Sequence, residues 1–280
     1  MHAIGVLWMA GEGDDVFERG SIGELQAAGI RFEELPQAEM KKRWPQIYLD
    51  DVPWGIYEPD GGFLMARMAC QAVVEGFQAE GGTFRLGAVT GDLEDSKWNE
   101  IGFADGSTLA ADAYVFACGP WLGRLFPQTI GKRVKVTKQD LFFFGTPAAD
   151  DRYSQARMPV WGDRREPFMY GIPGNDGRGF KIGDDTRGEE FDPTSGERVA
   201  SPEGMKKVRE YMEYRFPGMK GAPLVEARVC QYEQSPDANF IVEQHPATAN
   251  VWMVGGGSGH GFKHGPALGE MVARKVRERL

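Results

Sequence analysis

A glycine-rich loop near the end of the chain carries the residue types best suited to bind a ligand. The apolar run 251–254 is expected to form a strand, and a helix with one apolar face is expected from Pro266 onward. A loop that joins a strand to a helix N-terminus exposes backbone N–H groups, which attract anionic or electron-rich ligands. A ligand site is therefore predicted in the residues Gly255-Gly256-Gly257-Ser258-Gly259-His260-Gly261-Phe262-Lys263-His264-Gly265.

This loop does not match the common dinucleotide-binding fingerprint. No register of residues 255–265 gives G-x-G-x-x-G, and the chain that follows is too short for a βαβ unit with an acidic ribose ligand. Gly11-Glu12-Gly13 also fails the pattern, and no helix is expected to follow it. The loop is therefore expected to contact something other than a dinucleotide pyrophosphate.

The histidines and cysteines do not indicate a metal centre. His260 and His264 are four residues apart, but they lie among glycines, and no carboxylate follows at metalloprotease spacing. The three cysteines, Cys70, Cys118 and Cys230, are widely spaced and odd in number. This pattern excludes a disulfide framework and a C-x-x-C site.

The composition is that of an ordinary soluble globular protein. The 280 residues are 41% hydrophobic and 26% charged, and the formal net charge is -9. This charge argues against a nucleic-acid-binding role and provides no basic face for anionic membranes. No apolar run approaches about eighteen residues, and no signal-peptide pattern opens the chain. A cytoplasmic location is the expectation.

The middle of the chain indicates a sheet covered on both sides. The segment 63–79 is apolar nearly all round, which predicts a helix buried on several sides. A strand is expected at 83–89, a hairpin at 97–103 and 107–111, and a strand apolar on both faces at 113–118. This last strand ends in Cys118-Gly119-Pro120-Trp121, the kind of strand end at which open α/β sheets bind ligands.

The remaining segments predict an antiparallel sheet with a few helices. An opening strand is expected at 2–9, helical patches at 21–28 and 37–43, and a helix capped by Ser201. Trp44-Pro45 should end the second patch, because a residue before proline disfavours the helical region. Further strands are expected at 133–144, 158–161, 167–172, 179–183, 224–233 and 238–243.

The predicted fold class is α/β, with two interleaved domains. Residues 56–130 and 245–280 are assigned to an α/β domain. Residues 1–55 and 131–244 are assigned to an antiparallel-sheet domain.

A longer stretch that ends in the glycine loop resembles a known family. The residues from Arg228 through Cys230, Tyr232, Pro236 and Asp237 to Pro246, followed by the loop, are similar to the monomeric sarcosine oxidase and N-methyl amino acid oxidase branch of the D-amino-acid-oxidase-like flavoproteins. The similarity extends in order through most of the chain, including Glu58-Pro59-Asp60-Gly61-Gly62 and the strand end at Cys118. The resemblance implies an FAD-binding α/β domain interleaved with an antiparallel-sheet substrate domain.

The resemblance implies how FAD is held. It makes Cys230 the residue that carries a thioether to the 8α methyl of the flavin, a bond that requires a thiolate at the ring edge. It places the loop and the following helix N-terminus against O2 and N1 of the flavin, where reduction places negative charge. The cofactor-binding residues so assigned are Cys230, Gly256, Gly257, Ser258, Gly259, His260, Gly261, Phe262, Lys263, Val89, Cys118, Gly119 and Trp121.

The resemblance also implies four catalytic residues. Lys181 matches the lysine that helps oxygen accept electrons, and Lys263 matches the residue that pairs with the substrate carboxylate. Tyr170 falls at the pocket tyrosine of the family, and His260 would line the glycine loop. Without the resemblance, Lys181 and Lys263 are surface lysines and Cys230 is a small buried hydrophobe. Asp184-Asp185 stand where the family tends to carry a histidine, which could favour a cationic or amino-sugar substrate.

The implied activity is FAD-dependent oxidation of the C–N bond of a secondary or N-methyl amino acid or amine. Hydride would pass to the flavin, and molecular oxygen would reoxidise it to give hydrogen peroxide. The alternatives are a fructosyl-amino-acid oxidase, a flavin dehydrogenase with another acceptor, or a non-catalytic fragment that cannot hold FAD alone. The last alternative arises because the family's G-x-G-x-x-G unit and its carboxylate-binding arginine are not found before Glu58. The oligomeric state stays open.

Overall fold

The computed structural model describes residues 1–13, 15–90, 93–94 and 100–279, and its chain divides into two units. Unit 1 contains residues 1–64, 139–188 and 197–230, and unit 2 contains residues 65–138, 189–196 and 231–280. The predicted division of FAD and substrate between two domains stays a prediction. Among the described residues, no helix is long and apolar enough to cross a membrane.

Unit 1 is built on a large, mostly antiparallel sheet. The strand order is β12-β8-β11-β10-β9-β1-β3-β2. Strands β1 and β9 are parallel, whereas the pairs β2–β3, β1–β3, β9–β10, β10–β11 and β8–β11 are antiparallel. Strands β8 and β12 continue into unit 2. The bounds are β1 Val6–Ala10, β2 Glu33–Pro36, β3 Trp54–Glu58, β8 Lys135–Phe144, β9 Val160–Asp163, β10 Met169–Ile172, β11 Phe180–Asp184 and β12 Leu224–Gln234.

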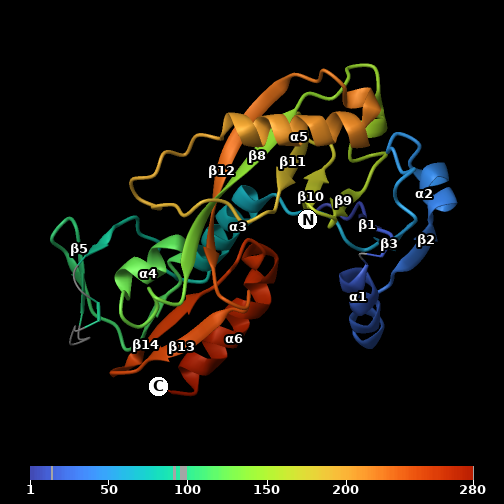
Figure 1. Ribbon diagram of the computed structural model, residues 1–280. Coiled ribbons are helices and arrows are strands. Elements are labelled where there is room, and N and C mark those ends of the chain that lie inside the picture. Colours follow the sequence, from blue (N-terminus) through green and yellow to red (C-terminus); the bar gives the residue numbers. More distant parts are fainter. Residues whose placement is uncertain (14, 91–92, 95–99, 280) are drawn as a thin grey trace. The chain divides into compact units, whose positions relative to one another are not determined.

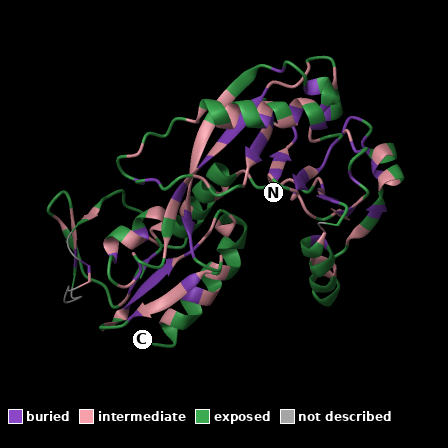
Figure 2. Ribbon diagram, in the orientation of Figure 1, coloured by how far each residue is buried: buried purple, intermediate pink, exposed green. Residues whose placement is uncertain are grey.

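Helix α5 (Pro202–Arg215) covers one face of this sheet (Figure 1). The Ser201 hydroxyl accepts the Gly204 N–H at 3.0 Å, so the predicted N-cap is confirmed. Val208 and Met212 of the helix are buried against strand residues that include Leu7, Met9, Phe142, Trp161, Met169, Phe180 and Ile182. These buried positions form the core of unit 1 (Figure 2).

The helices α1 (Val16–Ala27) and α2 (Gln37–Arg43) flank the β1–β3 end of the sheet. Helix α2 has the predicted bounds and ends at Trp44, before Pro45. Helix α1 begins five residues earlier than the predicted patch and follows soon after Gly13, so the expectation that no helix follows Gly11-Glu12-Gly13 is wrong. Two short 3-10 helices, η2 (Asp151–Tyr153) and η3 (Pro217–Met219), complete unit 1.

A buried charge network ties the end of α5 to the rest of unit 1. The Arg215 guanidinium is 1% exposed and donates to Asp51 Oδ1 at 2.7 Å and to Asp163 Oδ2 at 3.1 Å. Arg165 also donates to Asp163, at 2.7 Å, and the Tyr211 hydroxyl donates to the same oxygen at 2.8 Å. The Asp51 and Asp163 carboxylates thus share one fully buried cation, Arg215, and a second, partly exposed one, Arg165.

Replacing Arg215 by methionine is expected to lower the free energy of unfolding by about 3 kcal/mol. This value is at the low end of the stability loss expected when one partner of a buried ion pair is removed, because Arg165 and Tyr211 still donate hydrogen bonds to Asp163. Urea unfolding measures the change, and Lys206→Met on the exposed side of α5 is the control. A loss no larger than that of the control would contradict a structural role for the network.

The described residues of unit 2 form two small sheets. One has the order β13-β14-β7, with β14 parallel to β7, and the other has the order β4-β5-β6. The bounds are β4 Val89–Thr90, β5 Ile101–Phe103, β6 Thr108–Leu109, β7 Tyr114–Phe116, β13 Ile241–His245, β14 Thr248–Gly255, α3 Ala66–Ala79, η1 Gly119–Trp121, α4 Leu122–Leu125, η4 Gly261–His264 and α6 Gly265–Arg277. The predicted start of the C-terminal helix is therefore confirmed to within one residue, and the helix ends at Arg277.

Three sequence-based expectations for unit 2 are wrong in part. Helix α3 has no buried residue, and Val73 is 71% exposed, because an apolar pattern does not itself supply a partner to bury it. The predicted strand 83–89 reduces to Val89–Thr90. Strand β7 is buried on one face only, since Val115 is 46% exposed. The expected hairpin is present as β5 and β6, and its residues 97–99 lie outside the described residues.

Candidate functional site

The face of the unit 1 sheet opposite α5 carries the three predicted site residues of this unit, Tyr170, Lys181 and Cys230. Register places Trp8, Gly162, Tyr170 and Gly183 side by side on four strands, so their side-chain positions share one face. Lys181 lies two residues before Gly183 and therefore on the same face. The Lys181 ammonium stands 5.2 Å from the centre of the Tyr170 ring.

Strand β12 brings Cys230 to the same place. The Arg228 guanidinium lies 5.5 Å from the centre of the Phe143 ring, and Phe143 is the register partner of Lys181. Cys230 follows two residues later, on the face of Arg228, and interacts electrostatically with Lys181. The structure therefore brings Cys230, Lys181 and Tyr170 together, although they lie far apart in sequence.

Burial and charge act in opposite directions on the Cys230 thiol. Burial raises its pKa, while the neighbouring Lys181 and Arg228 cations favour the thiolate without overcoming that effect. Burial likewise lowers the pKa of the Lys181 ammonium, and Arg178 and Arg228 lower it further against the opposing effect of Cys230 and Asp185. The Lys181 ammonium therefore loses its proton at a lower pH than an exposed lysine does, whereas the Cys230 thiol loses its proton at a higher pH than an exposed cysteine does.

The two aspartates that follow β11 have different surroundings. The Asp184 carboxylate forms an ion pair with Lys207 of α5, on the core-facing side of the sheet. Asp185 acts on Lys181, and raises the pKa of its ammonium. Alternation along β11 turns Asp184 to the face opposite Lys181. The suggestion that acidic groups here favour a cationic or amino-sugar substrate therefore rests on Asp185 alone.

In unit 2 the glycine loop leaves the sheet beside the end of β7. Strands β14 and β7 are parallel and in register at Met253 and Phe116, so Gly255 and Cys118 emerge at the same edge. This edge is where parallel sheets bind ligands. Gly119 has a φ of +51°, with nothing within 4 Å of where a Cβ would stand, so the backbone is open to close approach.

Glu233, which the sequence analysis did not single out, fixes the start of the loop. Its carboxylate accepts the Gly256 N–H at 2.9 Å, and its carbonyl accepts the Ser258 N–H at 3.0 Å. The Ser258 hydroxyl in turn accepts the Ser235 N–H at 3.1 Å. The N–H groups of Gly256 and Ser258 are therefore already hydrogen-bonded within the protein. A ligand at this loop must accept hydrogen bonds from other loop residues.

Burial raises the pKa of Glu233 to about 7, and its Oε1 is buried with no hydrogen-bond partner. The two Gly N–H donors at 256 and 257 act in the opposite direction but do not overcome the burial. A carboxyl near neutrality just below a predicted ligand loop is the sort of group found at functional sites. The sequence could have suggested Glu233 as a site residue, because it is an acidic residue three positions after Cys230.

Glu233 is expected to make stability fall as the pH rises through neutrality. The folded state binds the proton more tightly than the unfolded state, so the contribution is full below about pH 4.5 and declines up to about pH 7. The loss amounts to on the order of 3 kcal/mol, from the difference between about 7 and 4.5. Urea unfolding of Glu233→Gln across this range should show the slope removed, whereas Glu270→Gln on α6 should keep it. An unchanged slope in Glu233→Gln would refute the assignment.

The histidines of the loop pack with an aromatic ring. His260 and His264 lie 5.6 Å and 5.4 Å from Phe240, measured between ring centres, and His260 Nε2 is 3.1 Å from the Ala238 carbonyl. Burial lowers the pKa of His264, and Lys263 and His260 lower it further. Within the described part of the chain, no cluster of three or more His, Cys, Asp or Glu side chains could hold a metal.

The other predicted site residues of unit 2 fall into two groups. Some belong to the glycine loop, and the others lie on neighbouring elements. Phe262 and Lys263 are exposed in η4, which leads directly into α6. Gly259 has a φ of +83°, and the Tyr232 ring occupies the space that a side chain would need. The Trp121 indole donates to Thr194 at 3.0 Å, and the pKa of Cys118 is raised by burial and by Glu233. Val89 lies in the separate β4-β5-β6 sheet.

The structure combines a mostly antiparallel sheet in unit 1 with a second unit of helices and small sheets, which is a mixed α/β fold. Residues 1–275 match the family described as FAD dependent oxidoreductase (DAO), so the chain belongs to this family. The chain is an FAD-dependent oxidoreductase, and relatives in this family bind FAD.

Named relatives are similar to the chain over most of its length. It is 29% identical over 276 residues to monomeric sarcosine oxidase of Bacillus sp. (strain NS-129), covering 96% of this chain and 70% of that protein. It is 29% identical over 278 residues to N-methyl-L-tryptophan oxidase of Salmonella dublin, covering 94% and 70%. A modified fructosyl peptide oxidase from Aspergillus nidulans shares the fold, with a TM-score of 0.83 at 19% identity over 100% of this chain and 72% of that one.

The residues present fit the cofactor that the family implies. In unit 2, the open backbone at Gly119 and the loop beside it can approach a planar group closely. In unit 1, Cys230, Lys181 and Tyr170 line one half-buried face with a thiol, a cation and a ring. FAD offers a ring methyl to a thiol and a planar surface to an aromatic side chain.

Proposed function

We propose that the protein oxidises the C–N bond of a secondary or N-methyl amino acid or amine. Bound FAD supplies the electron acceptor, and molecular oxygen takes the electrons onward to give hydrogen peroxide. The observation that carries the proposal is the grouping of Lys181, Cys230 and Tyr170 on one half-buried sheet face. Similarity to a sarcosine oxidase and an N-methyl-L-tryptophan oxidase supports the substrate class.

Each residue of this face has a distinct task. Cys230 would hold the cofactor through a thioether, in which a C–S bond replaces a C–H bond of the ring methyl and molecular oxygen takes up the two electrons released. The neighbouring cations favour the thiolate that this bond requires. Lys181 holds a positive charge where oxygen is reduced, which stabilises the developing negative charge. Tyr170 forms an aromatic wall against which the substrate packs, and its ring keeps the Lys181 ammonium in place.

In unit 2, the loop residues Gly256, Gly257, Ser258, Gly259 and Gly261 form the backbone against which FAD lies. The hydrogen-bond donors to FAD come from loop positions other than Gly256 and Ser258. Glu233 and Ser235 hold this backbone in position. Lys263, exposed at the start of the helical segment, provides a cation for the carboxylate of an amino acid substrate. His260 keeps its ring against Phe240 and lines the loop.

Oxygen uptake with a panel of amines tests the proposal. The chain supplied with FAD should consume oxygen and form peroxide with N-methyl amino acids, and more slowly with primary amines. Turnover that requires an artificial acceptor and uses no oxygen would instead support a dehydrogenase. No turnover of any amine with either acceptor would contradict the proposed function.

A further inference from the structure

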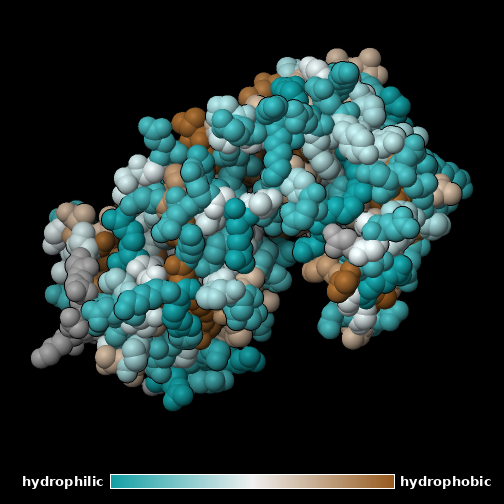
Figure 3. Space-filling model, in the orientation of Figure 1, coloured by the Kyte–Doolittle hydropathy of each residue, from teal (hydrophilic) through white to brown (hydrophobic). Residues whose placement is uncertain are grey.

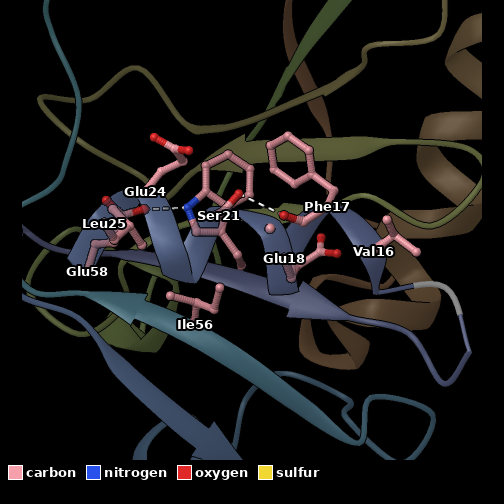
Figure 4. Close-up of a pocket in the computed structure, with 10 residues that line it drawn as sticks. Val16, Phe17, Glu18, Ser21, Glu24, Leu25, Ile56 and Glu58 are labelled. Atoms are coloured by element: carbon pink, nitrogen blue, oxygen red, sulfur yellow. Dashed lines mark hydrogen bonds between the residues drawn. The ribbon is translucent and has the colours of Figure 1, made fainter. Parts of the chain in front are cut away.

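A cavity of about 580 Å³ lies between helix α1 and the β1–β3 end of the sheet (Figure 4). Trp8 and Ile56 form its floor, and Phe17 and Leu25 of α1 form its apolar wall. Phe17 is 52% exposed and Val16 is 82% exposed, and the hydrophobic surface over α1 is visible in the space-filling view (Figure 3). The proposed oxidation does not use this cavity.

The charged groups that line the cavity are all acidic. They are Glu18, Glu24 and Glu58, and the lining contains no lysine, arginine or histidine. The Trp8 indole donates to Glu58 Oε1 at 2.7 Å, which holds this carboxylate beside the aromatic floor. Acidic oxygens next to aromatic rings are a favourable environment for an organic cation.

The cavity lies on the same side of the sheet as Lys181 and Tyr170. Trp8 and Ile56 occupy the same cross-strand row as Tyr170, so their side chains lie on the same side of the sheet. The Phe168 and Tyr170 rings are 6.1 Å apart, and the Arg164 guanidinium stacks 4.9 Å from Phe168 and 3.6 Å from Phe17. Arg164 thus borders the acidic cavity on the side of Tyr170.

The distance between the cavity and Tyr170 determines how long a molecule must be to contact both. Trp8 and Tyr170 are separated by strand β9, which makes two strand spacings, or about 10 Å. A small N-methyl amino acid cannot span this distance. An extended amine can place one nitrogen beside Tyr170 and another group in the cavity.

We propose that the cavity binds the positively charged far end of an extended amine substrate, whose oxidised nitrogen lies near Tyr170. This inference rests on the proposed function, because it names the substrate class of that same face. The far end is a primary ammonium or a similar organic cation. Because Glu58 lies on β3, beyond the β1 strand of Trp8, this cation stands roughly 10 Å or more from the oxidised nitrogen. Glu58 and Glu24 provide the opposite charges, and Trp8 and Phe17 provide the aromatic surfaces.

Titration calorimetry of the FAD-supplied chain with N-methyl diamines tests this inference. The probes carry a methylamino group at one end and a primary ammonium at the other, with spacers that bracket the distance. Matched probes end in a methyl group instead. The diamine of matching length should bind about tenfold more tightly than its methyl-ended counterpart, as expected for hydrogen bonds to charged groups.

Variants of the lining locate the effect. Glu58→Gln keeps the acceptor for the Trp8 indole but removes the charge, and Glu24→Gln removes a charge from an exposed helical position. The two changes together should reduce the preference for the diamine to about twofold or less. Glu12→Gln removes one charge outside the cavity and should leave the preference intact.

The possible outcomes separate this inference from the proposed function. Equal binding of the two probe series, or an equal effect of Glu12→Gln, would overturn the cavity assignment even if the amines are oxidised. Length-dependent binding of diamines without oxidation of any probe would overturn the proposed function, and with it the substrate role of the cavity. Tighter binding and faster oxidation of the same diamine would support both.

Discussion

Cys230→Ala is expected to abolish all flavin that stays with the chain after denaturation. The proposed attachment is a single thioether, and no other side chain on this sheet face offers a sulfur. Wild-type protein incubated with FAD should show flavin fluorescence at the position of the chain on a denaturing gel. Cys70→Ala and Cys118→Ala should keep that fluorescence.

The surroundings of Cys230 also predict how attachment depends on pH. Burial raises the pKa of the thiol, so the reactive thiolate is a minor species at neutral pH. Attachment should therefore become faster as the pH rises towards the thiol pKa. Fluorescence that persists in Cys230→Ala, or attachment that is fastest at acidic pH, would contradict the proposed role.

Lys181→Met is expected to slow the reaction with oxygen by about 10²- to 10³-fold, which is typical for the loss of one group that stabilises developing charge. The step in which the amine reduces the flavin should change much less. Stopped-flow measurement of the two steps separates them. Lys207→Met is a matched control, because Lys207 pairs with Asp184 on the opposite side of the same sheet.

The charge on Lys181 adds a pH dependence to this prediction. Burial lowers the pKa of the ammonium, so its charge is lost at a lower pH than for an exposed lysine. The oxygen reaction should weaken as the pH rises through that value, and Lys181→Met should lack the dependence. Equal slowing of both steps in Lys181→Met would instead indicate a structural role.

Local sequence signals predicted the elements that depend on neighbouring residues. Ser201 and Pro202 start α5, Trp44-Pro45 ends α2, and the glycine loop leads into α6 within one residue of the expected start. Each of these signals acts through the backbone of a few adjacent residues. The resemblance to flavin-dependent amine oxidases then identified the family.

The grouping of the site residues depends on contacts between segments that are far apart in the sequence, which local sequence patterns do not predict. Alternation along β11 could separate Lys181 from Asp184, but only the register with β10 and β8 places Tyr170 and Phe143 beside Lys181. The contact between Glu233 and Gly256 joins residues that are 23 positions apart. Helix α3 shows the reverse case, in which an apolar pattern predicted burial that the described structure does not provide.

The most direct test of the central claim is anaerobic mixing of the FAD-supplied chain with an N-methyl amino acid, followed by visible absorbance. The account predicts that the absorbance of oxidised flavin is lost, and that it returns when air is admitted with formation of peroxide. Protein-bound flavin that no secondary amine can bleach would contradict the claim that this chain oxidises C–N bonds.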